Sequence, residues 1–236
     1  MKPIQILLVL LSAGIFSACT FNLGKKGNGH VVSEERQVSE NFTEIKASGG
    51  LDIYLIQGNE NKIEVEADEN LLEQIQTYIK NGKLYITSKN IGKSSAKNVY
   101  VTFIELNNIQ ASSGVDIVGK SVLKSEELTL KTSSGAELKL EVLSREIKAN
   151  SSSGAEMELS GKATSLYAAA SSGSELNAKN LLTINCTARA SSGSEIKINV
   201  QEKLTAKASS GGSIEYYGNP LSVESNKSSS GSVKRK

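Results

Sequence analysis

The sequence predicts an all-β protein folded as a right-handed parallel β-helix, a solenoid with coils of roughly twenty residues. Three observations predict this fold. A Ser-Ser-Gly unit recurs at nearly constant spacing, hydrophobic and polar residues alternate between the units, and no segment has the period of an amphipathic helix. Proline occurs only 2 times, so strands can run without interruption, and 20 glycines supply turn positions.

The first residues have the pattern of a targeting segment. Lys2 gives a positive start, and residues 4–16 form an almost unbroken apolar run. A run of this length is too short to span a bilayer and is typical of a secretory signal, here residues 1–18. The ending Phe16-Ser17-Ala18-Cys19 resembles a bacterial lipobox with phenylalanine in place of the usual leucine. Cys19 is therefore the expected lipid-attachment residue; the alternative is an ordinary cleaved signal followed by an incidental cysteine.

Residues 19–30 follow as a polar segment that contains glycine and few hydrophobic residues. This composition predicts a flexible, lipidated tether between the membrane and the folded domain. Thr20, rather than an aspartate, follows the cysteine, and by resemblance to other Gram-negative lipoproteins this favours the outer membrane. The membrane is thus one expected partner, and both a periplasmic and a cell-surface orientation stay open.

Cys186 would have no disulfide partner if Cys19 is acylated. Leu182, Ile184, Cys186 and Ala188 occupy every second position, which predicts that Cys186 is a small core residue on the inner face of a strand. A reactive thiol is the alternative, but no histidine neighbours Cys186 in the sequence.

The Ser-Ser-Gly unit defines the repeat. Its glycines are spaced 21, 19, 19, 20, 18 and 20 residues apart, at Gly114, Gly135, Gly154, Gly173, Gly193, Gly211 and Gly231. An earlier relative, Ser48-Gly49-Gly50, stands apart from this series. Glycine permits positive φ at a corner, and small serines tolerate identical neighbours about 4.8 Å above and below.

Alternation between the corners predicts short strands with one apolar face. Leu138, Leu140 and Val142 alternate with charged residues, for example. A strand rises roughly 3.3 Å per residue, so each unit wraps only a few short strands, and stacked coils can bury a face that one coil cannot. A β-sandwich with regular hairpins is the main alternative, but hairpins would give shorter spacings and would not need the same corner each time.

The repeat also predicts two columns of charge. Two residues after the glycine come acidic side chains: Asp52, Asp116, Glu137, Glu156, Glu175 and Glu195. Four residues before the glycine the side chains are mostly basic: Lys46, Lys131, Arg189, Lys207 and Lys227. Like charges at coil spacing repel by about 1 kcal/mol in water, so we expect the acidic column to be solvated and paired with the basic column across the corner. A calcium-binding ladder is the alternative, but the G-G-x-G-x-D motif of calcium-binding β-rolls is missing.

Residues 31–105 differ from the repeat of residues 106–226. Strands are expected on either side of Gly58-Asn59, a capping box and one helical turn at Asn70–Glu73, and a hairpin around Asn81-Gly82. We expect this section to close the open end of the solenoid. The polar end, from Ser225 and including the tail of residues 227–236, is expected to fray.

Several of these motifs together resemble one family. They are Phe42-Thr43-Glu44-Ile45 with Gly49-Gly50, the run Asp68-Glu69-Asn70-Leu71-Leu72, the hairpin Asn81-Gly82-Lys83-Leu84 and the Ser-Ser-Gly series. They look like the family named "putative auto-transporter adhesin, head GIN domain", over nearly all of residues 40–230. The resemblance implies a β-helical envelope protein of Bacteroidota-like bacteria and brings no established catalytic residues.

Composition and the resemblance together favour a binding module over an enzyme. The net charge is +2 and aromatics are 5% of residues, so nothing indicates a nucleic-acid surface. His30 is the only histidine and lies in the tether, and the acidic residues are spread evenly rather than clustered.

We therefore expect a lipid-anchored, non-catalytic module that needs no metal or cofactor and binds an unknown glycan or protein. The first alternative is a periplasm-facing structural or envelope-stress lipoprotein. A polysaccharide-active enzyme is a more remote alternative. An ice-binding or mineral-binding ladder would be expected to show flat threonine arrays, which are missing here.

Overall fold

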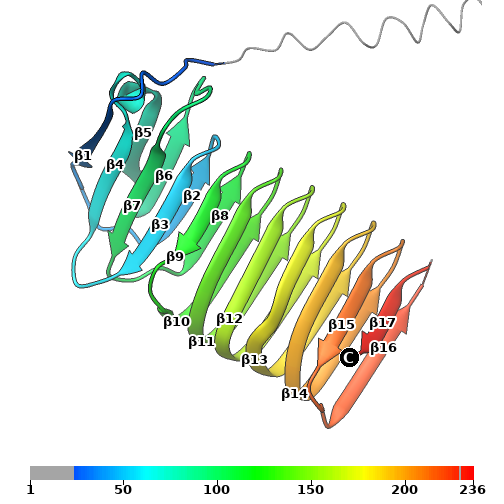
Figure 1. Ribbon diagram of the computed structural model, residues 1–236. Helices are drawn as coiled ribbons and strands as arrows, with labels where there is room; N and C mark the ends of the chain where they lie inside the picture. Colours follow the sequence, from blue (N-terminus) through cyan, green and yellow to red (C-terminus); the bar gives the residue numbers. More distant parts are fainter. Residues whose placement is uncertain (1–23, 229) are drawn as a thin grey trace, which may run out of the picture.

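The computed structural model describes residues 24–228 and 230–236 and has the shape of an elongated stack of coils (Figure 1). The predicted signal peptide and Cys19 lie outside the described residues. Within them the regular structure is β apart from one 3-10 helix, η2 (Glu69–Gln74), and no helix is long and apolar enough to cross a bilayer. The predicted all-β parallel solenoid is confirmed.

The strands follow one another along the whole described chain. They are β1 (Val31–Arg36), β2 (Glu44–Ser48), β3 (Asp52–Gln57), β4 (Lys62–Asp68), β5 (Ile75–Lys80), β6 (Lys83–Ser88), β7 (Lys97–Phe103), β8 (Asn108–Ser112), β9 (Asp116–Gly119), β10 (Leu123–Thr132), β11 (Glu137–Ser151), β12 (Glu156–Ala170), β13 (Glu175–Ala190), β14 (Glu195–Ala208), β15 (Ser213–Tyr217), β16 (Ser222–Lys227) and β17 (Ser232–Arg235).

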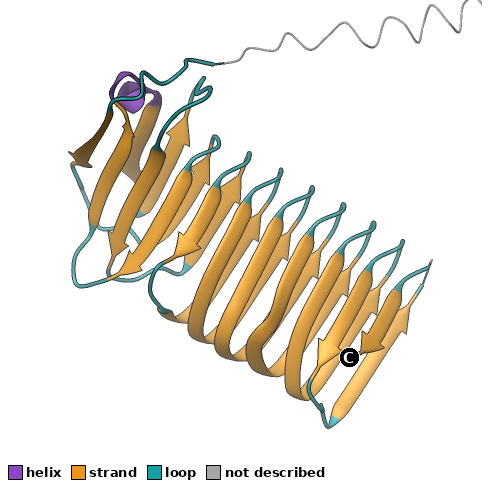
Figure 2. Ribbon diagram, in the orientation of Figure 1, coloured by secondary structure: helices purple, strands orange, loops and turns teal. Residues whose placement is uncertain are grey.

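Each full coil has two walls joined by a tight corner and a wider bend. β11 leaves a corner at Glu137 and returns to the next corner at Ser151, and its alternation of buried and exposed residues shifts after Ser144, between the two walls. It pairs in parallel with β12, so that Glu137 lies opposite Glu156 and Ser151 opposite Ala170. We call the segments that leave the corners the post-corner wall and those that lead into them the pre-corner wall. The corners form a row of loops along one edge of the stack (Figure 2).

Each repeated corner is a type I′ turn. In one of them, Ser134 has φ 54° and Gly135 has φ 69°, and the Ala136 N–H donates to the Ser133 carbonyl at 3.2 Å. A type I′ turn requires positive φ at both central residues, which explains the glycine. A Cβ added to Gly135 would meet nothing within 4 Å, so the backbone conformation and not lack of space demands glycine here.

The corners are also hydrogen-bonded to one another. The Gly135 N–H donates to the Ser153 carbonyl of the next corner at 3.2 Å, and the Gly154 N–H donates to Ser172 at 3.1 Å. The same bond recurs from Gly50 to Ser113, Gly114 to Ser134, Gly173 to Ser192 and Gly193 to Ser210. Because the Ser-Gly peptide places its N–H and C=O along the stacking axis, the β-ladder continues through the turn.

The isolated Ser48-Gly49-Gly50 unit belongs to the same row of corners. β2 pairs with β8 and β3 pairs with β9, both in parallel. On their other side, β2 pairs with β6 and β3 with β7. The coil order along the axis is therefore β6–β7, β2–β3, β8–β9, which is not the chain order. Residues 31–105 thus contribute two coils as well as a cap, and the predicted boundary at residue 106 is not the start of the solenoid.

Antiparallel strands cap the N-terminal end, as expected. β4 pairs with β7 and β1 with β4, while β5 forms the predicted hairpin with β6 around Asn81-Gly82, where both φ values are positive. The strands flanking Gly58-Asn59 are present but not paired with each other, because β7 lies between β3 and β4. The helical turn is confirmed, but the capping box is wrong: the N-cap is Asp68 and its side chain makes no cap hydrogen bond.

The expected flexible tether is wrong for residues 24–30, which are bound to this cap. The Asn70 side chain accepts from the Asn28 N–H at 3.0 Å and donates to the Lys26 carbonyl at 2.9 Å. Buried Asp68 accepts from the backbone N–H groups of Gly29 and Ser95. Burial opposes ionisation of Asp68, but these backbone hydrogen bonds outweigh it and lower the pKa of the carboxyl.

The expected fraying of the polar end is also wrong. β16 pairs with β14, and β17 pairs with β15 in parallel. Ser230, with φ 65°, takes the place of the corner glycine, because Ser232 lies opposite Ser213. Lys227 consequently lies opposite Ala208, and Asn226 rather than Lys227 lies opposite Lys207.

Polar residues mark the end of the stack at β16. Ser225 and Lys227 are exposed and lie opposite Ala206 and Ala208, which are buried. Polar and charged residues on a terminal strand discourage the addition of another strand. The polar residues that suggested a loose tail therefore form the last strands of a regular solenoid.

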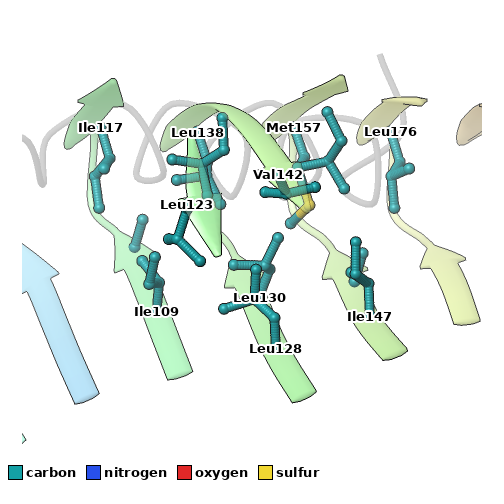
Figure 3. Close-up of a cluster of buried hydrophobic side chains, with 14 of the residues drawn as sticks. Ile109, Ile117, Leu123, Leu128, Leu130, Leu138, Val142, Ile147, Met157 and Leu176 are labelled. Carbon is teal, nitrogen blue, oxygen red and sulfur yellow. The ribbon is translucent and has the colours of Figure 1, made fainter. Parts of the chain in front are cut away.

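The core fills the space between the walls and is graded in size (Figure 3). Next to the corners the buried residues are small, such as Ala111, Thr132, Ser151, Ala170, Ala190 and Ala208. Farther from the corners they are large, such as Ile109, Leu130, Leu138 and Met157. This gradient follows from the tight I′ turn, which brings the two walls close together at the corner.

Replacing a corner glycine tests the conformational requirement. Gly154→Ala is expected to lower the free energy of unfolding by about 1 kcal/mol, because alanine is strained at φ 67° although the space is open. Urea denaturation of the two proteins measures the change. Ser153→Asn is the control: asparagine tolerates positive φ, so stability should be kept or raised. Equal stability of Gly154→Ala and wild type would contradict the turn assignment.

Candidate functional site

A continuous groove with several polar lining residues lies along the pre-corner wall, beside the corners. It has a volume of about 560 Å³ and is lined by residues from six successive coils. Its outer column, in register from coil to coil, is Lys46, Gln110, Lys131, Asn150, Ala169 and Arg189. Ala169 has the shortest side chain of this column and lies between Asn150 and Arg189. The first serines of the corners, such as Ser133 and Ser152, line the side of the groove nearest the turns.

The charged side chains that line this groove are all positive. Three cationic side chains line it, Lys46, Lys131 and Arg189, and none of its lining residues is acidic. Lys207 extends the column by one more coil, opposite Arg189. In the described part of the chain, no carboxylate forms an ion pair with any of these four cations. The groove is therefore a site where positive charge is not neutralised by the protein itself.

Aromatic residues continue the same face. Tyr85 lies in register with Lys46 and stacks on Tyr78 of the hairpin, with ring centroids 4.9 Å apart. Tyr78 is 49% exposed. Near the other end, the Arg189 guanidinium lies 5.6 Å from the Tyr167 ring centroid. No aromatic cluster is evident in the sequence, because Tyr78 and Tyr85 become neighbours only through the hairpin register.

The acidic column is confirmed on the post-corner wall. Asp52, Asp116, Glu137, Glu156, Glu175 and Glu195 lie opposite one another in consecutive coils. The expected pairing with the basic column across the corner is wrong, because the two columns lie on different walls. The counter-ions come from the acidic wall itself: Lys97 lies 3.2 Å from Asp52, and Lys197 lies 2.9 Å from Glu175 and 3.4 Å from Glu195.

Two carboxyl groups of the acidic column have raised pKa values. Burial, together with Asp52, raises the pKa of Asp116, and burial, together with Glu137 and Glu175, raises the pKa of Glu156. Within residues 24–228 and 230–236, no group of three or more potential ligand residues is arranged to hold a metal ion. The calcium ladder considered from the sequence thus has no supporting geometry in the described chain.

Cys186 and His30 lie in different parts of the described fold. Cys186 is 3% exposed, between Leu166 and Leu204 of the neighbouring coils, and burial raises the pKa of its thiol to about 12. The prediction of a core cysteine is confirmed. His30 lies at the cap, 3.4 Å from Glu69 and far along the chain from Cys186.

Comparison with known proteins places the chain among relatives of the same fold. Residues 41–220 match the sequence model of the family described as "Putative auto-transporter adhesin, head GIN domain". A crystal structure of a putative adhesin from Bacteroides fragilis covers 90% of this chain and 100% of its own, with 18% identity and a TM-score of 0.84. No curated protein matches the sequence.

Two further crystal structures are similar over nearly their whole length. A putative adhesin from Parabacteroides merdae has 22% identity and a TM-score of 0.72, covering 90% of this chain and 98% of its own. A structure from Parabacteroides distasonis, named a putative lipid binding protein, has 18% identity and a TM-score of 0.72, covering 90% and 99%. At these identities the likeness shows the parallel solenoid fold.

The acidic column predicts an unusual pH dependence of stability. Because the pKa of Glu156 is raised in the folded state, its ionisation destabilises the fold as pH rises above the unfolded-state value of about 4.3. Glu156→Gln should therefore raise the free energy of unfolding at pH 7 by about 0.2–1 kcal/mol, a range that allows for solvent screening. The gain should vanish near pH 3, where the carboxyl is protonated in both states.

Glu175→Gln is the matched control for this measurement. It lies in the same column but is paired with Lys197, so its loss also removes an ion pair. Its gain in urea denaturation at pH 7 should be smaller. A Glu156→Gln protein less stable than wild type at pH 7 would contradict the proposed repulsion.

The buried thiol predicts protection from chemical modification. In a Cys19→Ala chain, Cys186 is the only thiol. Its pKa of about 12, against an ordinary 9.0, should slow its reaction with a disulfide reagent on the order of a thousandfold relative to the urea-unfolded chain. Absorbance of the released thiolate measures both rates. Equal rates would show that Cys186 is accessible in the folded protein.

Proposed function

Because this chain belongs to the family described as "putative auto-transporter adhesin, head GIN domain", we propose that it is a non-catalytic binding module of the bacterial cell envelope. The observation that carries the proposal is the groove of the pre-corner wall, where unneutralised cations and polar side chains from six coils form one continuous surface. Such a surface suits adhesion to an extended partner. A catalytic site would instead need a nucleophile or acid beside a suitable base.

The proposal includes a lipid anchor at Cys19 in the outer membrane. Four residues separate Cys19 from Gly24, the first described residue, which lies at the capped end of the stack. An extended chain spans at most ~3.6 Å per residue, so the five steps from Cys19 to Gly24 reach about 18 Å. Because residues 24–30 are bound to the cap, an anchor at Cys19 would hold the capped end near the lipid headgroups. The solenoid and its groove would then point away from the anchor.

Display on the cell surface distinguishes this proposal from its alternative, a periplasm-facing structural lipoprotein. Intact cells that produce the wild-type chain are treated with a protease that does not cross the outer membrane, and the protein is then detected by immunoblot. The chain should be degraded on intact cells. A periplasmic maltose-binding protein in the same cells should stay intact and thereby show that the outer membrane is closed.

The matched variant is Cys19→Ala, which lacks the attachment thiol. The variant protein should be found in the soluble fraction instead of the membrane fraction. Cells that produce it should no longer attach to the surface that wild-type cells bind. Full protection of the wild-type chain from external protease would contradict surface adhesion and favour the periplasm-facing structural lipoprotein. Retention of Cys19→Ala in the membrane fraction would contradict the anchor.

A further inference from the structure

We propose that the groove of the pre-corner wall binds a linear acidic polysaccharide that lies along the axis of the solenoid. This inference rests on the proposed binding function and specifies its ligand class. The groove crosses successive coils at a fixed spacing of about 4.8 Å, which is close to the length of one pyranose unit in an extended glycan. A polymer of sugars can therefore present equivalent groups to equivalent positions on successive coils.

The spacing of the cations matches a polymer that carries charge at intervals. Along the column, Lys46 and Lys131 are two coils apart, Lys131 and Arg189 three coils apart, and Arg189 and Lys207 adjacent. Neutral hydrogen-bonding or small residues occupy the coils between them, namely Gln110, Asn150 and Ala169. Cations separated in this way pair with carboxylates or sulfates, and the intervening amides can hydrogen-bond to sugar hydroxyls.

Aromatic residues supply the apolar contact that sugar rings need. The stacked Tyr78–Tyr85 pair prolongs the column at the capped end, and half-exposed Tyr78 offers ring surface to the C–H face of a sugar. Tyr167, which the Arg189 side chain contacts, provides a second aromatic beside the column. The groove thus combines cations, hydrogen-bonding side chains and aromatic surface on one face.

The same features argue against a nucleic acid as the occupant. Four cations over about six coil spacings, roughly 29 Å, give a low density of positive charge. A DNA strand carries one phosphate per about 3.4 Å, and single-strand binders use aromatics along the whole track rather than mainly at its ends. An acidic protein would need a rigid surface that presents its carboxylates at the spacing of the cations. Single-stranded DNA and polyglutamate are therefore competing ligands in the test.

The test measures binding of three linear acidic polysaccharides to the purified full-length chain carrying Cys19→Ala: polygalacturonate, hyaluronate and chondroitin sulfate. Fully methyl-esterified polygalacturonate is the neutral control with the same backbone. Isothermal titration calorimetry at low and at physiological salt should show binding to at least one acidic polymer, weakened by salt, and none to the ester. Failure of all three acidic polymers to bind at low salt would overturn the proposal, as would equal binding of the ester.

A charge-matched pair of variants locates the site. Lys46→Gln, Lys131→Gln and Arg189→Gln together should weaken binding by about tenfold or more, since three exposed ion pairs are lost. Lys124→Gln, Lys162→Gln and Lys179→Gln change the net charge equally at exposed positions near the bends, and should change affinity less than about twofold. Thermal melting confirms that both variants fold. Equal loss in both triple variants would overturn the assignment to the groove.

The contribution of the aromatic contact to binding can be measured separately from that of the charges. Tyr78→Ser should weaken binding of the same polysaccharide about equally at low and at high salt, because it removes an apolar contact and not a charge. The groove triple variant should instead lose most affinity at low salt. Tighter binding of single-stranded DNA or polyglutamate than of any polysaccharide would overturn the ligand class.

The two proposals can fail separately. Cell attachment that depends on this protein, together with no binding of any acidic polysaccharide in vitro, would reject the ligand class and keep the binding function. Groove-dependent polysaccharide binding by a chain that is fully protected in intact cells would reject surface adhesion and keep the ligand class.

Discussion

The hydrogen bond from each corner glycine N–H to the serine carbonyl of the next corner is the interaction on which the rest of the structure depends. In an isolated type I′ turn, the central peptide faces solvent. Here its N–H and C=O point along the stacking axis, so each corner is bonded to the corners before and after it. The backbone ladder thus continues around the edge of the coil, and both walls stay in register through the turn. Serine at φ near 55° is strained, and this bond offsets the strain.

The fixed register has consequences for every outward side chain. Residues at the same position of successive coils lie next to one another along the axis. A residue type that recurs at one position of the repeat therefore forms a column on the surface. The acidic bias after the corner produces a column with mutual repulsion, relieved in part by Lys97 and Lys197. The basic bias before the corner produces the groove, whose cations have no such partners among the residues that the structure describes. Charge is therefore separated between the two walls, and the corner is the boundary between them.

The repeat period, the corners, the inward alternation and the acidic column could all be predicted from the sequence, because each depends on local backbone geometry. What could not be predicted depends on contacts between distant segments. The coil of β2 and β3 lies between β6–β7 and β8–β9, an order that no local pattern specifies. The groove was missed because its column mixes lysine, glutamine, asparagine and alanine, and only register reveals it. The hairpin at Asn81-Gly82 does carry a usable signal, since its two-residue turn places Tyr78 opposite Tyr85.

Amide hydrogen exchange at the corner glycines tests the central claim most directly. An exposed turn amide without a partner exchanges rapidly, whereas a ladder amide exchanges only when the structure opens. The amides of Gly114, Gly135, Gly154 and Gly173 should therefore be protected to an extent similar to buried strand amides such as that of Leu138, although the glycines themselves are exposed. Exchange of these glycine amides at the rate of an unstructured peptide, with protected strands on either side, would show that the corners are not bonded to one another.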